Sequence, residues 1–473
     1  MHLTVLIVYS ILIIALGMWI GRKVETTDSF FVAGRKLGPI LIFSTMFAAN
    51  IGAGSTVGAA GLGYSGGLSG YWWVGSAGIG TFLLAFWIGP KIWRIAREQN
   101  LQTAGDFLEF RYGKEIRATI AILLWVGTLA ILAGQLIALA WVLDVVAGVP
   151  KPVGCLIGGV VMTAYFAAGG LLSSAWVNLF QAVIMIVGHA VALPWALAKA
   201  GGWAAVVAAA PLSSSASAGY FDFWGGSASW TMLAMLAPAF VVSPGLLQKV
   251  YGARDERAIR IGVGWCAVAL MLFAAIPPML GMVARVFDPN LANGELALPM
   301  VLTTALPVWL GSLALAAVVS AQLSSADAVL FMLSTSLSKD LYKRFVRPEA
   351  DDRRVLQVAR IAAWVGGVIG VALAIALPSV IASLSIFYSL LSVSLFVPVV
   401  AGLYSRRIGT PEALAAIGGG VALLIAATFA PWREWVGAFG WVASLSPTTW
   451  GLVGSALAFG VVMVLRSARS RKA

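Results

Sequence analysis

Charged side chains are scarce in this sequence: only 11% of its 473 residues are Asp, Glu, Lys or Arg, against about 25% in soluble domains. Hydrophobic residues make up 60% of the chain, more than a soluble core could bury. Two cysteines and two histidines leave no disulfide framework and no zinc cluster. The composition therefore excludes a soluble globular domain and indicates a protein whose solvent is lipid.

Apolar runs of about 20 residues, the length that crosses about 30 Å of hydrocarbon, recur along the whole chain. We predict thirteen transmembrane spans, at residues 3–20, 39–64, 71–88, 120–146, 153–168, 177–197, 229–248, 261–286, 299–337, 355–377, 381–404, 413–429 and 449–465. Because lipid cannot satisfy backbone polar groups, these spans are expected to be helices. The first run has no small-residue cleavage site after it, which favours a retained helix over a signal peptide.

Basic residues fall in alternate loops of this span assignment. All but four of the 31 Lys and Arg lie on one side, the exceptions being Lys151, Lys199, Arg285 and Arg433. Since cytoplasmic loops are rich in Lys and Arg, we predict an external N-terminus and a cytoplasmic C-terminus in the plasma (inner) membrane. Topology thus explains the net charge of +12, and no nucleic-acid partner is expected.

Two of the predicted spans are interrupted. The second carries Asn50, Ser55 and several glycines where a lipid-facing helix would carry leucine, and the seventh contains Pro238 and Pro244. Close packing through small residues, or a kink without a ligand, would explain either one alone. Their equivalent places in two five-span halves favour an inverted repeat with a central site, where freed carbonyls bind an ion.

The ninth span carries Ser324, Ser325 and Asp327. Hydroxyls in membrane helices commonly bond back to the i−4 carbonyl, but beside a broken helix they would suit a monovalent cation, which needs several oxygens around it. Asp327 is the one carboxylate well inside a predicted span, and such a group usually faces a cavity or a partner. No Lys or Arg is expected deep in a span to pair with it.

Several segments resemble signatures of the sodium:solute symporter family, which includes the sodium–proline and sodium–sugar cotransporters. They are DSFFVAGR (28–35), YFAAGG (165–170) before Gln181, GLLQKVYGARDERA (245–258), and SSAD (324–327) followed by STSLSKDLY (334–342). The segments occur in the family's order, and the span count fits the whole chain.

The resemblance implies an all-α membrane protein of about 13 transmembrane helices, with a leucine-transporter-like core of two inverted five-helix repeats. The expected divisions are an extra N-terminal helix and cytoplasmic loop (1–37), the first repeat (38–199), an external loop (200–228), the second repeat (229–404), and two C-terminal helices with a short basic tail (405–473). It also implies a secondary active symporter that imports sodium and a small organic solute by alternating access.

Carried over by position, the sodium ligands would be the carbonyls of Ala48, Ile51 and Ala321 and the hydroxyls of Ser324 and Ser325. The solute site would be lined by Asn50, Ser55, Trp72, Trp73, Phe240, Ser243, Tyr388 and Ser389. Asp327 and Asn178 are candidates for coupling or relay. The family usually has Thr-Asp where Val177 and Asn178 stand, and Asn cannot ionise, so the resemblance does not support a second cation site there.

The charged solute-binding residues of the sugar transporters are absent from the core spans, which favours a carboxylate-bearing solute over a sugar. The positive end of a half-helix and the bound sodium would satisfy that anion. Two alternatives stay open: a proton-coupled transporter that uses Asp327, and a passive channel or facilitator. No enzymatic activity is expected, because no His, Cys, Asp and Glu cluster has metal-ligand or nucleophile spacing.

Overall fold

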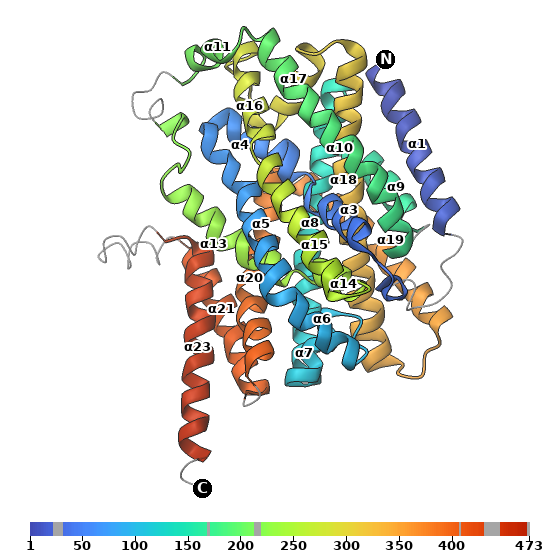
Figure 1. Cartoon of the computed structure of the whole chain (residues 1–473), viewed down its shortest axis with the longest axis vertical. Helices are drawn as coiled ribbons and strands as arrows, with labels where there is room; N and C mark the ends of the chain where they lie inside the picture. Colours follow the sequence, from blue (N-terminus) through green and yellow to red (C-terminus); the bar gives the residue numbers. More distant parts are fainter. Residues whose placement is uncertain (22–31, 168–170, 212–218, 406–407, 430–444, 471–473) are drawn as a thin grey trace.

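Almost all of the described chain is helical, as the apolar runs predict (Figure 1). The computed structural model describes residues 1–21, 32–167, 171–211, 219–405, 408–429 and 445–470. In this part of the chain no strand forms, and one isolated bridge joins Leu37 to Ala253. The predicted all-α class is confirmed.

Most helices of the first half lie on the predicted spans, and three lie outside them. The helices are α1 (His2–Gly21), α3 (Pro39–Asn50), α4 (Ala59–Gly66), α5 (Tyr71–Leu83), α6 (Gly89–Glu98), α7 (Ala104–Tyr112), α8 (Lys114–Ala147), α9 (Lys151–Ala167), α10 (Leu171–Lys199) and α11 (Trp203–Ala208). The second predicted span is divided between α3 and α4, as its polar and glycine-rich middle suggests. The long helix α8 ends at Gly148, whose left-handed conformation (φ +63°) favours glycine and stops a helix.

The second half repeats this order. Its helices are α13 (Ser227–Val242), α14 (Pro244–Tyr251), α15 (Glu256–Phe273), α16 (Ile276–Phe287), α17 (Ala297–Thr304), α18 (Val308–Thr335), α19 (Asp352–Ala376) and α20 (Val380–Tyr404), followed by α21 (Thr410–Thr428) and α23 (Pro447–Ser470). Within the described residues, ten helical segments are long and apolar enough to cross a membrane, and three shorter apolar helices accompany them. Each predicted span overlaps at least one of these segments, although the ninth, predicted at 299–337, begins on the separate short helix α17.

Helix packing repeats when the two halves are exchanged. Helix α5 packs against α13 as α15 packs against α3, and α8 packs against α20 as α18 packs against α10. Helices α9 and α19 pack on α8 and α18 in the same way. This is the pattern of two structurally related five-helix units, as expected for the leucine-transporter-like fold. The boundaries at 38–199 and 229–404 stay predictions.

The remaining helices flank this core. Helix α1 packs on α18 and α10, and α21 and α23 form a hairpin against α20. The chain begins and ends at opposite ends of the bundle in Figure 1, as an odd number of crossings requires. Which end faces the cytoplasm stays a prediction.

Helix α18 lies at the centre of the bundle. In its most apolar stretch 89% of the residues are buried, against 33% for α21 and 28% for α23. The polar residues of α18 therefore face other helices, whereas α21 and α23 present their apolar side chains outward, as helices surrounded by lipid do.

A buried ion cluster ties three elements together where the basic loops gather. The guanidinium of Arg117 on α8 lies 2.8 Å from carboxylate oxygens of Asp106 and Glu109 on α7. It lies 2.7 Å from Asp340 on the π-helical segment η6 (Ser336–Val346), which continues α18. Arg117 is only 6% exposed. These charge-assisted bonds hold α7 against the ends of α8 and α18.

Replacing Arg117 by leucine would leave three partly or fully buried carboxylates without their shared cation. We expect Arg117→Leu to lower the free energy of unfolding by about 3–5 kcal/mol, measured by detergent-driven unfolding in mixed micelles. The control is Arg254→Leu, because Arg254 is exposed and pairs with an exposed Asp255, so its loss should cost less than about 1 kcal/mol. Equal losses in the two variants would contradict the structural role of the cluster.

Candidate functional site

The first helix break lies between α3 and α4. Helix α3 ends at Asn50, and Ile51 takes an extended conformation (φ −92°, ψ 105°). A π-helical turn, η2 (Gly54–Gly58), then leads into α4. Glycines at 52, 54 and 58 favour the break, since each costs a helix about 1 kcal/mol relative to alanine. Because α3 stops here, its last carbonyls have no N–H donor from a following helical turn.

Two serines on α18 lie against these freed carbonyls. Ser324 Oγ lies 2.8 Å from the carbonyl oxygen of Ala48 and 3.2 Å from that of Ala321. Ser325 Oγ lies 3.0 Å from the carbonyl oxygen of Ile51. Both serines are buried, and so are Ala48, Ile51 and Ala321. The structure thus brings together all five residues predicted to hold sodium.

This cluster holds more acceptors than donors. The oxygens of Ala48, Ala49 and Ile51 lie within 3.4 Å, 3.2 Å and 3.0 Å of Ser325 Oγ. One hydroxyl hydrogen can satisfy only one of them. A small cation would satisfy several oxygens at once, so the donor set fits a hard monovalent ion without any carboxylate.

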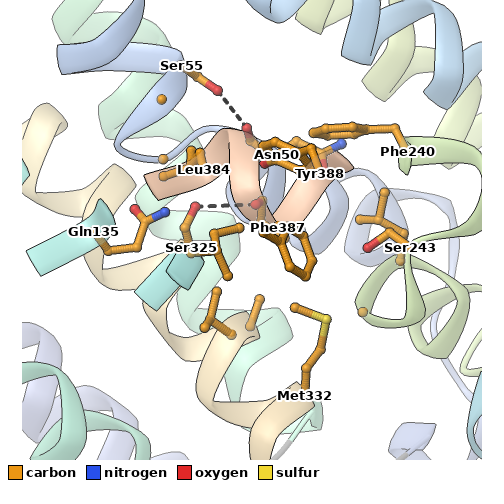
Figure 2. A pocket seen from close by; sticks show the side chains of 18 of the residues that line it. Asn50, Ser55, Gln135, Phe240, Ser243, Ser325, Met332, Leu384, Phe387 and Tyr388 are labelled. Carbon is orange, nitrogen blue, oxygen red and sulfur yellow. Dashed lines mark hydrogen bonds between the residues drawn. The ribbon is translucent and has the colours of Figure 1, made fainter. Parts of the chain in front are cut away.

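Other groups freed by the break are bonded as well. Ser55 Oγ donates to the carbonyl of Asn50 at 2.8 Å (Figure 2). Gln135 on α8 accepts the main-chain N–H of Ala53 through its Oε1 at 2.9 Å. Gln135 is 1% exposed and was not assigned from the sequence. The sequence offered one sign of its role: Gln135 is a polar residue in the middle of a mostly apolar predicted span.

The second break separates α13 from α14. Helix α13 ends at Val242, Ser243 leaves helical geometry (φ −54°, ψ 121°), and Pro244 begins α14. The carbonyl of Ser243 accepts the N–H groups of Leu246 and Leu247 at 3.0 Å and 2.9 Å. Proline is favourable at a first helical position because its missing donor has no partner there. Pro238, by contrast, lies inside α13 without ending it.

A cavity lies between the two breaks (Figure 2). Its empty space, including the part open to solvent, is about 540 Å³. Gln135 and Ser325 lie on one side of it and Phe240 and Ser243 on the other. The predicted residues that line it are Asn50, Ser55, Phe240, Ser243, Ser325 and Tyr388. Lining residues that were not predicted include Gln135, Lys249, Met332, Leu384 and Phe387.

Three predicted solute-site residues lie elsewhere. Trp73 is behind the wall, its ring 6.2 Å from that of Tyr388. Trp72 donates to the carbonyl of Phe223 at 2.9 Å and so turns toward the segment before α13. Ser389 Oγ lies 2.7 Å from Thr448 Oγ1 on α23. Adjacent helical residues point in different directions, so Trp72 cannot share the orientation of Trp73, nor Ser389 that of Tyr388.

The two candidates for coupling, Asp327 and Asn178, are not among the residues that line the cavity. Asp327 is 5% exposed and accepts a hydrogen bond from Ser174 on α10. Asn178 on α10 donates to Thr45 Oγ1 on α3 at 3.3 Å. Both therefore link α10 to helices that carry the cluster.

One expectation from the sequence was wrong. Lys249 was assigned to a loop, but α14 continues through Tyr251 and leaves Lys249 only 3% exposed on the cavity wall. Lys249 also interacts electrostatically with Asp327. A buried cation therefore lies near the end of the helical segment that contains the seventh predicted span.

The structure describes part of the four segments that resemble signatures of a known family. Residues 28–31 and 168–170 lie outside the described residues. Residues 245–258 form most of α14 and the start of α15, and 324–342 run along α18 into η6. Two of these four segments therefore lie beside the breaks and the cavity.

The family's sequence profile matches residues 30–420, most of the chain. The chain belongs to the sodium:solute symporter family. It is 28% identical to the sodium/pantothenate symporter of Escherichia coli K12, over 89% of this chain and 90% of that protein. It is 24% identical to the sodium/glucose cotransporter of Vibrio parahaemolyticus, over 76% and 72% of the two chains. It is also 24% identical to a high-affinity choline transporter of Caenorhabditis elegans, over 88% of this chain and 76% of that protein.

Solved structures share the fold. A Na⁺-coupled sialic acid symporter in a substrate-bound outward-open state superposes with a TM-score of 0.77 at 17% identity, over 98% of both chains. A nucleobase-cation-symport-1 family transporter superposes with a TM-score of 0.59 at 14% identity, over 94% of this chain and 96% of that one. The family membership makes this symporter an integral multi-pass membrane protein with sodium as its coupled ion, and the expectation of a sodium:solute symporter is confirmed.

Gly52 tests the geometry of the first break. A Cβ there would lie 2.4 Å from Ser325 Oγ and 2.9 Å from Gln135 Oε1, so Gly52→Ala would displace both side chains from the main-chain groups that they contact. We expect the sodium concentration that gives half-maximal thermal stabilisation of the purified symporter to rise at least tenfold. Gly418→Ala on α21 is the control, because its Cβ would meet open space. An unchanged sodium requirement in Gly52→Ala would show that sodium binds elsewhere.

Proposed function

We propose that this symporter imports a small carboxylate-bearing solute together with sodium, by alternating access between the two faces of the membrane. The observation that supports this most is the acceptor-rich cluster of carbonyls and serine hydroxyls beside a cavity between two broken helices. Transport sites in inverted-repeat folds form at such breaks, where main-chain groups become available to ion and solute. We further propose that the N-terminus is external and the C-terminus cytoplasmic.

The proposed sodium ligands are the carbonyls of Ala48, Ile51 and Ala321 and the hydroxyls of Ser324 and Ser325. They come from α3 and α18, so a bound ion bridges the broken helix and the most enclosed helix of the bundle. The ligands are neutral, and the site gains its charge only when sodium enters.

Sodium and solute are coupled through α3 in this proposal. Asn50, which lines the cavity, lies between Ala48 and Ile51, whose carbonyls would bind the ion. Ser55, also on the cavity wall, donates to the carbonyl of Asn50. Fixing that stretch therefore also fixes part of the solute site. A coupling free energy of about 1–3 kcal/mol between ion and solute is typical of such linkage.

The proposed solute site keeps Asn50, Ser55, Phe240, Ser243 and Tyr388. The rings of Phe240 and Tyr388 lie 5.3 Å apart and form an aromatic wall. Trp73 supports that wall from behind. Trp72 and Ser389 are left out, because they point toward other partners.

A carboxylate is favoured as the anionic part of the solute. Ser243, Gly245 and Leu246 line the cavity, so the positive end of the α14 dipole faces it, and the proposed sodium adds a positive charge. The Escherichia coli relative, at 28% identity, is a sodium/pantothenate symporter, and pantothenate is a carboxylate.

The proton-coupled alternative has less support. Asp327 lies off the cavity wall and accepts its hydrogen bond from Ser174. In vesicles containing the purified symporter, an inward sodium gradient should accumulate the solute above its external concentration. A pH gradient in sodium-free buffer should not. Accumulation by the pH gradient alone would instead support proton coupling, and equilibration without accumulation would support a facilitator.

Removing both hydroxyls tests the sodium ligands. We expect the Ser324→Ala/Ser325→Ala variant to need at least tenfold more sodium for half-maximal uptake, because two of five ligands are lost. Ser389→Ala is the matched control, since Ser389 bonds to Thr448 and lies away from the cluster. Sodium titrations of initial uptake rates measure both. A double variant with the sodium dependence of the control would refute the ligand assignment.

A further inference from the structure

A buried ammonium group lies on the cavity wall. All eight residues of α14 are buried, and Lys249 near its end is 3% exposed. Its Nζ donates to the carbonyl of Gly245 at 3.2 Å. Gly245 is one turn earlier and two residues after the break at Ser243. The side chain therefore folds back along α14 toward the break.

This ammonium group has donors to spare and no anion in contact. It can donate three hydrogen bonds, and the bond to Gly245 uses one. Within the described part of the chain, Lys249 forms no ion pair with an acidic side chain. Asp327 interacts with it electrostatically without forming an ion pair, and its carboxylate accepts from Ser174 instead. A cation buried in a membrane helix is costly unless an anion approaches it.

We infer that Lys249 binds the carboxylate of the transported solute. This rests on the proposed function and names the residue that selects the anionic part of the solute. The cavity that Lys249 lines is also lined by apolar side chains, among them Leu246, Val329 and Met332. The chemistry of the site therefore fits a small monocarboxylate with an apolar or weakly polar body.

Charge balance gives this assignment a second consequence. Lys249 and Asp327 together carry no net charge, and neither do sodium and a monocarboxylate. The cavity region therefore stays neutral when both cargoes are bound, whereas either one alone leaves an uncompensated charge in a low-dielectric interior. Sodium and the carboxylate should accordingly strengthen each other's binding.

The test compares matched pairs of compounds that differ in the carboxylate: pantothenate and panthenol, lactate and lactamide, nicotinate and nicotinamide. Thermal stabilisation of the purified full-length symporter is titrated with each compound in sodium chloride and in potassium chloride. We expect at least one carboxylate, and not its neutral partner, to stabilise the wild type in sodium. Lys249→Met should require at least tenfold more of that carboxylate, and Lys249→Arg should stay within a few fold of the wild type.

The other outcomes separate the two claims. If Lys249→Met binds the carboxylate as tightly as the wild type, Lys249 is not the anchor, although the solute class stands. If neutral partners stabilise the wild type equally, or if no carboxylate stabilises it, both claims fail. Stabilisation of Lys249→Met by sodium alone shows that the variant is folded.

A second variant tests the charge balance without altering Lys249. In Asp327→Asn the ammonium loses its distant counter-charge, so the carboxylate should bind at least threefold more tightly in potassium chloride than it binds the wild type. Unchanged or weaker binding would contradict the inference, even if Lys249→Met did not fold.

Discussion

A main-chain carbonyl released by a helix inside a membrane must find another partner, because lipid offers none. In this symporter the carbonyls at the end of α3 meet two serine hydroxyls on α18. The break exposes carbonyls that need hydrogen-bond donors, and the two buried serines of α18 provide them. Three carbonyls share one hydroxyl at Ser325, so the arrangement is satisfied only in part until a cation joins it.

The rest of the site follows from that contact. The unwound stretch after Asn50 turns Asn50 and Ser55 toward a cavity, and the break at Ser243 opens the opposite wall. The two breaks lie in helices that hold equivalent places in the packing pattern shared by the two halves. An ion bound between α3 and α18 would therefore act on the same backbone that shapes the solute site, which is the linkage that symport needs.

Much of this could be predicted from the sequence. The sequence shows glycines and polar residues around Asn50, and a proline, Pro244, in the seventh span. The structure has a helix break at each of these two places. Ser324 and Ser325 are conspicuous within an apolar run. Local patterns suffice for these features, because a helix break and a polar residue in lipid are both decided by neighbouring residues. The ion and its carbonyl ligands, in contrast, came only from the resemblance to a family.

Side-chain direction could not be predicted in the same way. Ser389 follows Tyr388, which lines the cavity, and Trp72 precedes Trp73, which packs near Tyr388, yet a helix turns neighbouring residues to different faces. Lys249 stands one residue beyond the predicted span, and only the continuation of α14 and the folding back of its long side chain bring the charge to the cavity. Gln135 accepts the main-chain N–H of Ala53, 82 residues away in the first break, a contact that no local pattern reveals.

The most direct test of this account is an experimental structure of the symporter determined in sodium and again with sodium replaced by potassium. The account predicts an ion in the sodium structure, in contact with the carbonyls of Ala48, Ile51 and Ala321 and the hydroxyls of Ser324 and Ser325, and no such ion in potassium. An unbroken helix at residues 51–53, or sodium bound away from α3 and α18 while these hydroxyls stay bonded to carbonyls, would contradict it.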